Sequence, residues 1–143
     1  MKIAVCSSLD FIKEIKESAD TLRKRKFEVI IPMTAEKILN GEVTEDQIRH
    51  EKETGKISER VIKHDIIRYY FNKIRECDAI LVLNMEKKGI KGYIGGATFL
   101  EMGFAHVLGK KIFLFNEIPD VRYKDEIRAM QPIIINGDLN RIR

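Results

Sequence analysis

The fold follows most directly from the stretch DAILVLN at residues 78–84 and the segment YIGGATFLEMGFA at residues 93–105. The first stretch is apolar at consecutive positions, so both faces of a strand there are expected to be covered. That is the environment of a parallel strand between two layers of helices. Other short apolar runs, rich in β-branched or aromatic residues, lie at residues 3–5, 29–31, 112–115 and 133–135. We predict that these runs are the strands of one parallel sheet.

Helical patterns separate the apolar runs. The letters TEDQ at residues 44–47 form a capping box, which is a helix-opening signal, and Gly55 is expected to interrupt the helix that follows. Helices are predicted at residues 11–26, 44 to the interruption at Gly55, 58–76, 98–108 and 124–130. This alternation of strands and helices predicts an α/β layer fold with right-handed crossovers. Five strands fit a flavodoxin-like, doubly wound parallel sheet with the order 2-1-3-4-5.

Length and composition narrow the class of protein. The 143 residues indicate a single domain over residues 1–143, in which residues 33–57 are long for a crossover and are predicted to form a lid or a subunit contact. The formal net charge is +4 with well-mixed signs, which argues against a nucleic-acid partner. Two cysteines and the absence of a long apolar run predict a cytoplasmic protein without a membrane span. Abundant Lys, Glu and Ile without Trp is a composition typical of thermophiles.

The candidate site lies where the strand order reverses. Ligands of such sheets bind beyond the carboxyl ends of the strands, here at residues 6–10 and 84–96. Gly95 and Gly96 allow the backbone to approach a ligand, and the helix N-terminus after them suits a phosphate or a sugar oxygen. Glu101 is expected in the first turn of that helix, facing the same crevice. The alternative is that Thr98 and Glu101 form a capping box, in which Glu101 binds only the Thr98 backbone N–H, and that the glycines form a plain turn.

The segment from residue 78 to 115 resembles the nucleoside 2-deoxyribosyltransferase family. The matching features are the Asp-led apolar strand at 78–84, the Gly-Thr loop, the EMGFA helix at 101–105 and the Gly-Lys at 109–110 before the next strand. Weaker agreement continues at Cys6-Ser7-Ser8 and Asn136-Gly137-Asp138. The wider N-glycosidase superfamily includes nucleoside 5′-monophosphate N-glycosidases. The resemblance covers about a quarter of the chain and implies a homo-oligomer.

The resemblance implies a catalytic role for Glu101. Its carboxylate would attack the anomeric carbon of a sugar or stabilise an oxocarbenium-like state. The helix N-terminus is expected to lower the pKa of Glu101 and keep it ionised. Asn84 stands where the family has an acid at the end of the third strand, and Gly95 and Gly96 stand where it has an acid in the loop. Asp65 is therefore proposed as a replacement acid, because the start of its long helix is expected to overhang the site. A solvated surface carboxylate is the alternative reading of Asp65.

Further residues are assigned to substrate binding or to simpler roles. Tyr93 is predicted to stack on a base or donate its hydroxyl, unless it only anchors the loop. The other candidates are Ser7, Ser8, Asn84, Gly95, Gly96, Thr98, Asn136 and Asp138. Ser8 or Asp10 could instead cap a helix, and Asn136 to Asp138 could form a turn or reach a neighbouring subunit. Lys87, Lys88 and Lys91 are read as phosphate contacts or as solvated surface residues. The three histidines show no metal-binding pattern, and no metal or organic cofactor is expected.

We therefore predict N-glycosidic bond cleavage or deoxyribosyl transfer on a nucleoside or nucleoside 5′-monophosphate. The alternative is a non-catalytic nucleotide-binding module with the same fold. An FMN protein is disfavoured, because residues 6–10 lack a phosphate cradle rich in Ser, Thr and Gly. The orientation of Glu101 separates the first two readings: it points into an open pocket or folds back onto the Thr98 N–H.

Overall fold

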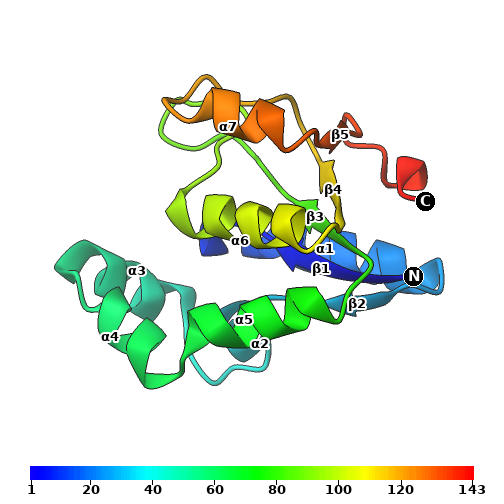
Figure 1. Cartoon of the computed structure of the whole chain (residues 1–143). Coiled ribbons are helices and arrows are strands. Elements are labelled where there is room, and N and C mark those ends of the chain that lie inside the picture. The colour runs from blue at the N-terminus through cyan, green and yellow to red at the C-terminus, as the bar shows by residue number, and fades with distance from the viewer.

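A five-stranded parallel sheet with the order β2-β1-β3-β4-β5 organises the chain, which a computed structural model describes from residue 1 to residue 143 (Figure 1). The strands are β1 (Lys2–Cys6), β2 (Glu28–Ile30), β3 (Ala79–Val82), β4 (Lys111–Leu114) and β5 (Ile133–Ile134). Every neighbouring pair is parallel. The predicted flavodoxin-like α/β fold and strand order are confirmed.

Helices cover both faces of the sheet. They are α1 (Ile12–Lys24), α2 (Met33–Leu39), α3 (Glu45–Thr54), α4 (Ile57–Lys63), α5 (Ile66–Arg75), α6 (Gly96–Val107) and α7 (Lys124–Ala129), with 3-10 turns at Leu9–Phe11 and Leu139–Arg141. Along β1, Ile3 and Val5 join the apolar cluster under α1 and α2, while Ala4 and Cys6 join the cluster under α5, α6 and α7. This two-sided burial is why the strand sequences are apolar at consecutive positions. No helix combines the length and the apolar character needed to cross a membrane.

The helix predicted at residues 58–76 is broken in two. Asp65 has a left-handed backbone conformation, with φ 48° and ψ 45°, between α4 and α5. A right-handed helix cannot pass through such a residue, so the chain changes direction there. The break lets α4 pair with α3. The Arg60 guanidinium donates to both carboxylate oxygens of Glu51, at 2.7 and 2.8 Å, and joins the two helices.

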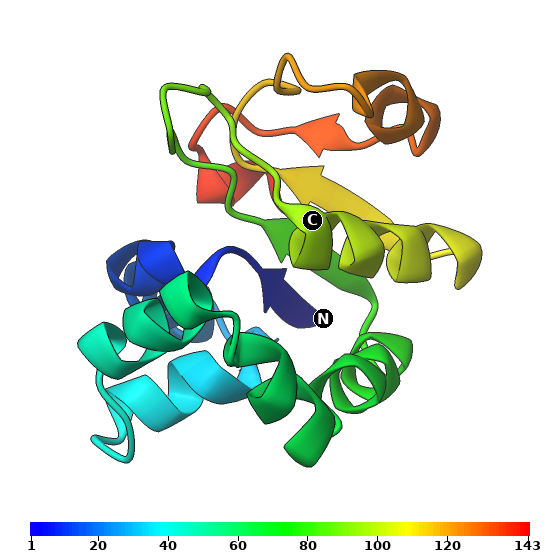
Figure 2. The same ribbon diagram turned by 90° about the vertical axis from the view of Figure 1, so that its left-hand side faces the viewer.

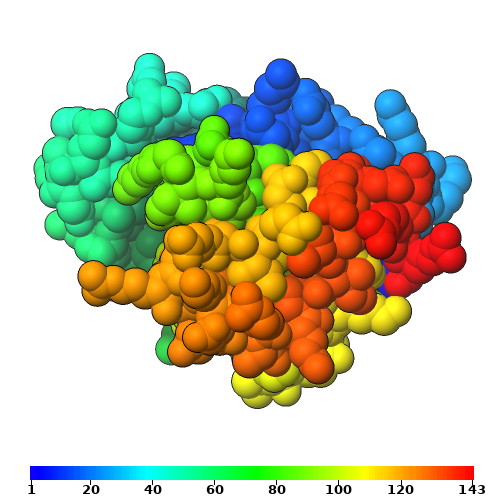
Figure 3. Space-filling model, turned by 90° about the horizontal axis from the view of Figure 1, so that it is seen from above, coloured from blue at the N-terminus to red at the C-terminus, as the bar shows by residue number.

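The paired helices α3 and α4, residues 45–63, are called the α3–α4 hairpin below. Within it, the predicted capping box and interruption are confirmed: the Thr44 hydroxyl accepts from the Gln47 N–H, and Gly55 ends α3 with a left-handed backbone. Both helices of the hairpin lie at one end of the molecule, on the side of the carboxyl ends of the strands (Figures 1 and 2). Seen from above, the segment after β3, residues 85–95, lies between this hairpin and the segment after β4 (Figure 3).

Candidate functional site

A cavity of about 320 Å³ opens beyond the carboxyl ends of β1 and β3. It is called the substrate cavity below. The loop after β1, the starts of α2 and α6, the segment after β3, α5 and the α3–α4 hairpin all contribute to its wall. The lining residues are Ser7, Ser8, Leu9, Pro32, Met33, Thr34, Lys52, Ile57, Val61, Ile66, Tyr70, Lys87, Tyr93, Gly95, Gly96, Ala97, Thr98 and Glu101. The sequence-predicted residues brought together here are Ser7, Ser8, Tyr93, Gly95, Gly96, Thr98 and Glu101.

Glu101 is the single carboxylate among the lining residues. The helix that carries it begins at Gly96 with Gly95 as its N-cap, so Thr98 lies inside the first turn. Glu101 makes no hydrogen bond to the Thr98 N–H, and the capping-box reading of this pair is therefore corrected. The carboxylate is available to a ligand in the cavity.

Burial raises the pKa of Glu101 to about 8, against an ordinary value of 4.5, and a hydrogen bond from the Cys6 thiol offsets only part of the rise. This corrects the expectation that the helix N-terminus holds the pKa low. Glu101 is the sixth residue of α6, and the effect of the helix dipole falls off within the first turn. Removal from water therefore dominates. The residue as a whole is only partly exposed, and it lines the cavity.

Two threonine hydroxyls and a set of backbone N–H groups in the cavity wall have no partner in the protein. Thr34 and Thr98 are each only 5% exposed, and their side chains make no hydrogen bond within the chain. No carbonyl accepts from the N–H groups of Gly96, Ala97 or Thr98 at the start of α6. No buried side-chain polar atom lacks a partner, so these hydroxyl oxygens are open to the cavity, and together with the N–H groups they are suited to a polar or anionic ligand.

The serines after β1 already have partners. The Ser7 hydroxyl donates to the Leu83 carbonyl oxygen at 3.0 Å, which leaves its lone pairs free to accept. The Ser8 hydroxyl accepts from the Asp10 N–H at 3.3 Å and from the Lys87 ammonium at 3.2 Å. The capping alternative is thus confirmed for Ser8.

Two lysines bring positive charge to the cavity. The Lys87 ammonium lies 2.6 Å from the Asp10 carboxylate and 5.2 Å from the centre of the Tyr93 ring. The Lys52 ammonium lies 3.6 Å from the same carboxylate. Burial lowers the pKa of Lys52, and the charge of Asp10 offsets part of that effect.

Tyr93 and Tyr70 serve the cavity differently. A Cβ atom on Gly95 would lie 3.2 Å from a Tyr93 ring carbon, so the absence of a side chain there lets the ring pack closely. The Tyr70 hydroxyl is buried and donates to the Val5 carbonyl oxygen. Tyr70 therefore supports the floor, whereas Tyr93 presents its ring to the cavity wall.

Asn84 does not line the cavity, which corrects its assignment to substrate binding. Its buried amide donates to the carbonyl oxygens of Gly92, Asn116 and Glu117 at 3.3, 3.1 and 3.0 Å. Its side-chain oxygen accepts from the Asn116 N–H at 2.8 Å. These bonds join the segments after β3 and β4, so the role of Asn84 is structural.

Asp65, Asn136 and Asp138 also lie outside the cavity wall. Asp65 is exposed and forms an ion pair with Arg68 at 2.8 Å, because the break in the helix places it on the surface. Asn136 has a left-handed backbone, and Asp138 caps the 3-10 turn at residues 139–141. The predictions of a catalytic role for Asp65 and of binding roles for Asn136 and Asp138 are therefore wrong for the cavity of the same chain.

Five further residues line the cavity that were not predicted from the sequence: Thr34, Lys52 and the apolar residues Met33, Ile57 and Val61. Thr34 lies two residues after Pro32, which itself follows a predicted strand, and this place at the carboxyl edge of the sheet was a usable signal. No local pattern marks Lys52, because its position depends on how the α3–α4 hairpin packs against the rest of the chain.

Comparison with known proteins gives little further information. No protein-family profile matches the sequence, and no curated protein is significantly similar to it. Among solved structures, the chain is similar to the CMP N-glycosidase BcmB of Clostridium botulinum, with 17% sequence identity, 95% of this chain and 90% of that chain covered, and a TM-score of 0.48. A likeness at this level carries no argument about activity, so the function rests on the residues of the cavity.

Proposed function

We propose that the substrate cavity binds a nucleoside 5′-monophosphate and that Glu101 cleaves its N-glycosidic bond. The observation that carries the proposal is the position of Glu101: one carboxylate in an open cavity, beside unpaired hydroxyl and N–H groups, in the segment that resembles the deoxyribosyltransferases. A sugar offers hydroxyl groups for the unpaired partners and an electrophilic anomeric carbon for the carboxylate.

The proposed reaction proceeds by displacement at the anomeric carbon. The ionised Glu101 forms a bond to that carbon while the bond to the base breaks, and the base leaves with the electron pair. Water or a second base then takes the sugar from the glutamate, which gives hydrolysis or transfer. Glu101 reacts as a carboxylate, so its raised pKa limits the reactive fraction near neutral pH.

The apolar and the positively charged residues that line the cavity support a nucleotide as the substrate. Apolar side chains of Met33, Ile57, Val61 and Ile66 offer a surface for the base, with Tyr93 as an aromatic neighbour. Lys52, Lys87 and the free N–H groups of α6 line the same cavity and favour a negatively charged group on the ligand. This charge is the reason for preferring a nucleotide over an uncharged nucleoside.

A non-catalytic nucleotide-binding module is the second candidate, and one observation favours it. No second carboxyl group lines the cavity to protonate the leaving base. In the catalytic reading, Tyr93 is the residue proposed to hydrogen-bond the base as it departs.

Release of free base, followed by chromatography, tests the proposal. A panel of ribo- and deoxyribonucleosides and their 5′-monophosphates is incubated with the native protein, with Glu101→Gln and with the control Glu126→Gln, an exposed glutamate on α7. We expect base release from a nucleotide by the native protein and the control, and a loss of at least about a hundredfold in Glu101→Gln. No release from any compound, together with a nucleotide-dependent rise in melting temperature, would support the binding module instead.

A homo-oligomer is also proposed. Val107 is 85% exposed and Leu100 44% exposed on α6, next to Phe71, Phe99 and Phe104, around an apolar hollow of about 460 Å³. Contiguous apolar surface of this kind is typical of protein contacts, and a second copy of the chain is the occupant that we propose.

A further inference from the structure

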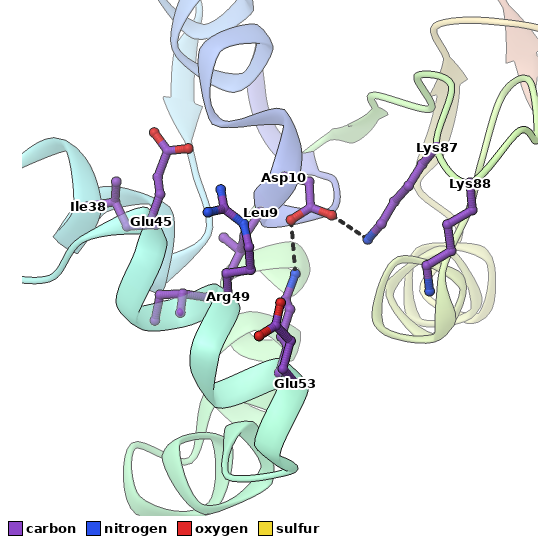
Figure 4. A pocket seen from close by; sticks show the side chains of 10 residues that line it. Leu9, Asp10, Ile38, Glu45, Arg49, Glu53, Lys87 and Lys88 are labelled. Carbon is purple, nitrogen blue, oxygen red and sulfur yellow. Dashed lines mark ion pairs between the residues drawn. The ribbon is translucent and has the colours of Figure 1, made fainter.

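A second cavity, of about 400 Å³, adjoins the substrate cavity beside the turn after β1 and α3 (Figure 4). The two cavities share Leu9, Lys52 and Lys87, so these side chains separate one from the other. Asp10 lines the second cavity but not the substrate cavity. The proposed reaction gives no role to this carboxylate.

Asp10 lies between two cations that come from different parts of the chain. One carboxylate oxygen is 2.6 Å from the Lys87 ammonium, after β3, and the other is 3.6 Å from the Lys52 ammonium, on α3. Burial alone would raise the pKa of Asp10, but the hydrogen bond from Lys87 and the charge of Lys52 outweigh it and hold the pKa below its usual range. The carboxylate is therefore ionised at neutral pH, and it is the shared ion-pair partner of both lysines.

A ligand anion in the substrate cavity meets the same two ammonium groups. It also lies near the negative charge of Asp10, which is on the other side of the shared lysine side chains, and like charges at short range repel each other. The ligand anion and Asp10 are thus alternative partners for Lys52 and Lys87. An uncharged nucleoside carries no anion to compete with Asp10, so the ion pairs of Asp10 with Lys52 and Lys87 stay in place.

We propose that Asp10 sets how tightly the substrate cavity binds a phosphate, because Asp10 and the phosphate compete for Lys52 and Lys87. This inference rests on the proposed function only for the identity of the ligand. It makes Asp10 a residue that sets phosphate affinity and the two lysines the phosphate contacts. Removing the Asp10 charge is therefore expected to strengthen phosphate binding, even though Asp10 does not line the substrate cavity itself.

Calorimetric titration with inorganic phosphate at constant ionic strength tests this proposal. The variants are Asp10→Asn, Lys52→Met, Lys87→Met and the control Asp20→Asn. Asp20 is a matched control, because its side chain is 43% exposed against 41% for Asp10 and is paired with Lys16 at 2.7 Å. We expect Asp10→Asn to bind phosphate about three- to tenfold more tightly, each lysine variant to bind less tightly by a similar factor, and Asp20→Asn to match the native protein.

Combined variants show whether Asp10 acts through the lysines. In the Lys52→Met/Lys87→Met background, Asp10→Asn is expected to give a smaller gain in phosphate affinity than in the native protein, because only the direct repulsion between Asp10 and the phosphate remains. Unchanged or weaker binding by Asp10→Asn, an equal gain in Asp20→Asn, or no phosphate binding by any variant would overturn the proposal. The titration is independent of base release, so a failure here leaves the role of Glu101 standing, and failed base release leaves this result standing.

Discussion

The protonation of Glu101 links the candidate site to the stability of the whole protein. Its pKa is about 8 in the folded protein and about 4.5 when the chain is unfolded. Between these values the folded protein binds more protons than the unfolded chain. The contribution of Glu101 to stability is therefore fully present below pH about 4.5 and is lost as pH rises through about 8.

A variant that stays neutral at all pH values removes this dependence. For Glu101→Gln we expect the free energy of unfolding near pH 9 to exceed that of the native protein by about 2–4 kcal/mol, with little difference near pH 4.5. Urea unfolding at a series of pH values measures it, with Glu126→Gln as the control. Equal pH slopes for the native protein and Glu101→Gln would show that burial does not perturb this carboxyl.

The hydrogen bonds of the Asn84 side chain are expected to contribute to the stability of the protein. Asn84→Ala leaves the Asn116 N–H and carbonyl oxygens after β3 and β4 without their partner in the interior. We expect a loss of about 2–4 kcal/mol in the free energy of unfolding. Asn40→Ala, at an exposed position after α2, serves as the control. A loss below about 0.5 kcal/mol in Asn84→Ala would contradict the structural role.

Among the elements, the start of α6 is the one that shapes the cavity. Gly95→Ala places a Cβ atom 3.2 Å from the Tyr93 ring, which has to move. We expect nucleotide affinity to fall about threefold or more, with a change of about 1 kcal/mol or less in stability, measured by calorimetry and urea unfolding. Gly103→Ala in the same helix meets open space, and we expect it to stabilise the protein by about 0.5–1 kcal/mol. Equal nucleotide affinity in the native protein and Gly95→Ala would show that Tyr93 does not contact the ligand.

The strands and most helices were predictable, because two-sided burial and helical spacing are recorded in the local sequence. The break at Asp65 was not, since neither glycine nor proline marks residues 64 and 65 and the left-handed conformation there depends on packing. Glu101 and the glycines were found because they belong to one short segment. Lys52 and Thr34 were not, because they join the cavity only through the packing of α2 and the α3–α4 hairpin.

At the scale of the whole molecule, the exposed face of α6 leads to a prediction about assembly. We expect sedimentation velocity to show a dimer or larger species for the native protein and a monomer for Val107→Asp, because a charge at the centre of an apolar contact is costly. Ile62→Asp is the control, since Ile62 is 77% exposed but lies on α4. A monomeric native protein at every concentration would show that the homo-oligomer prediction is wrong.

The most direct measurement of the central claim is the pH dependence of kcat/KM for base release. If Glu101 attacks as a carboxylate, kcat/KM rises about tenfold per pH unit at low pH, levels off above about pH 8, and is abolished in Glu101→Gln. A rate that falls above about pH 8, or base release that persists in Glu101→Gln, would contradict Glu101 as the attacking carboxylate.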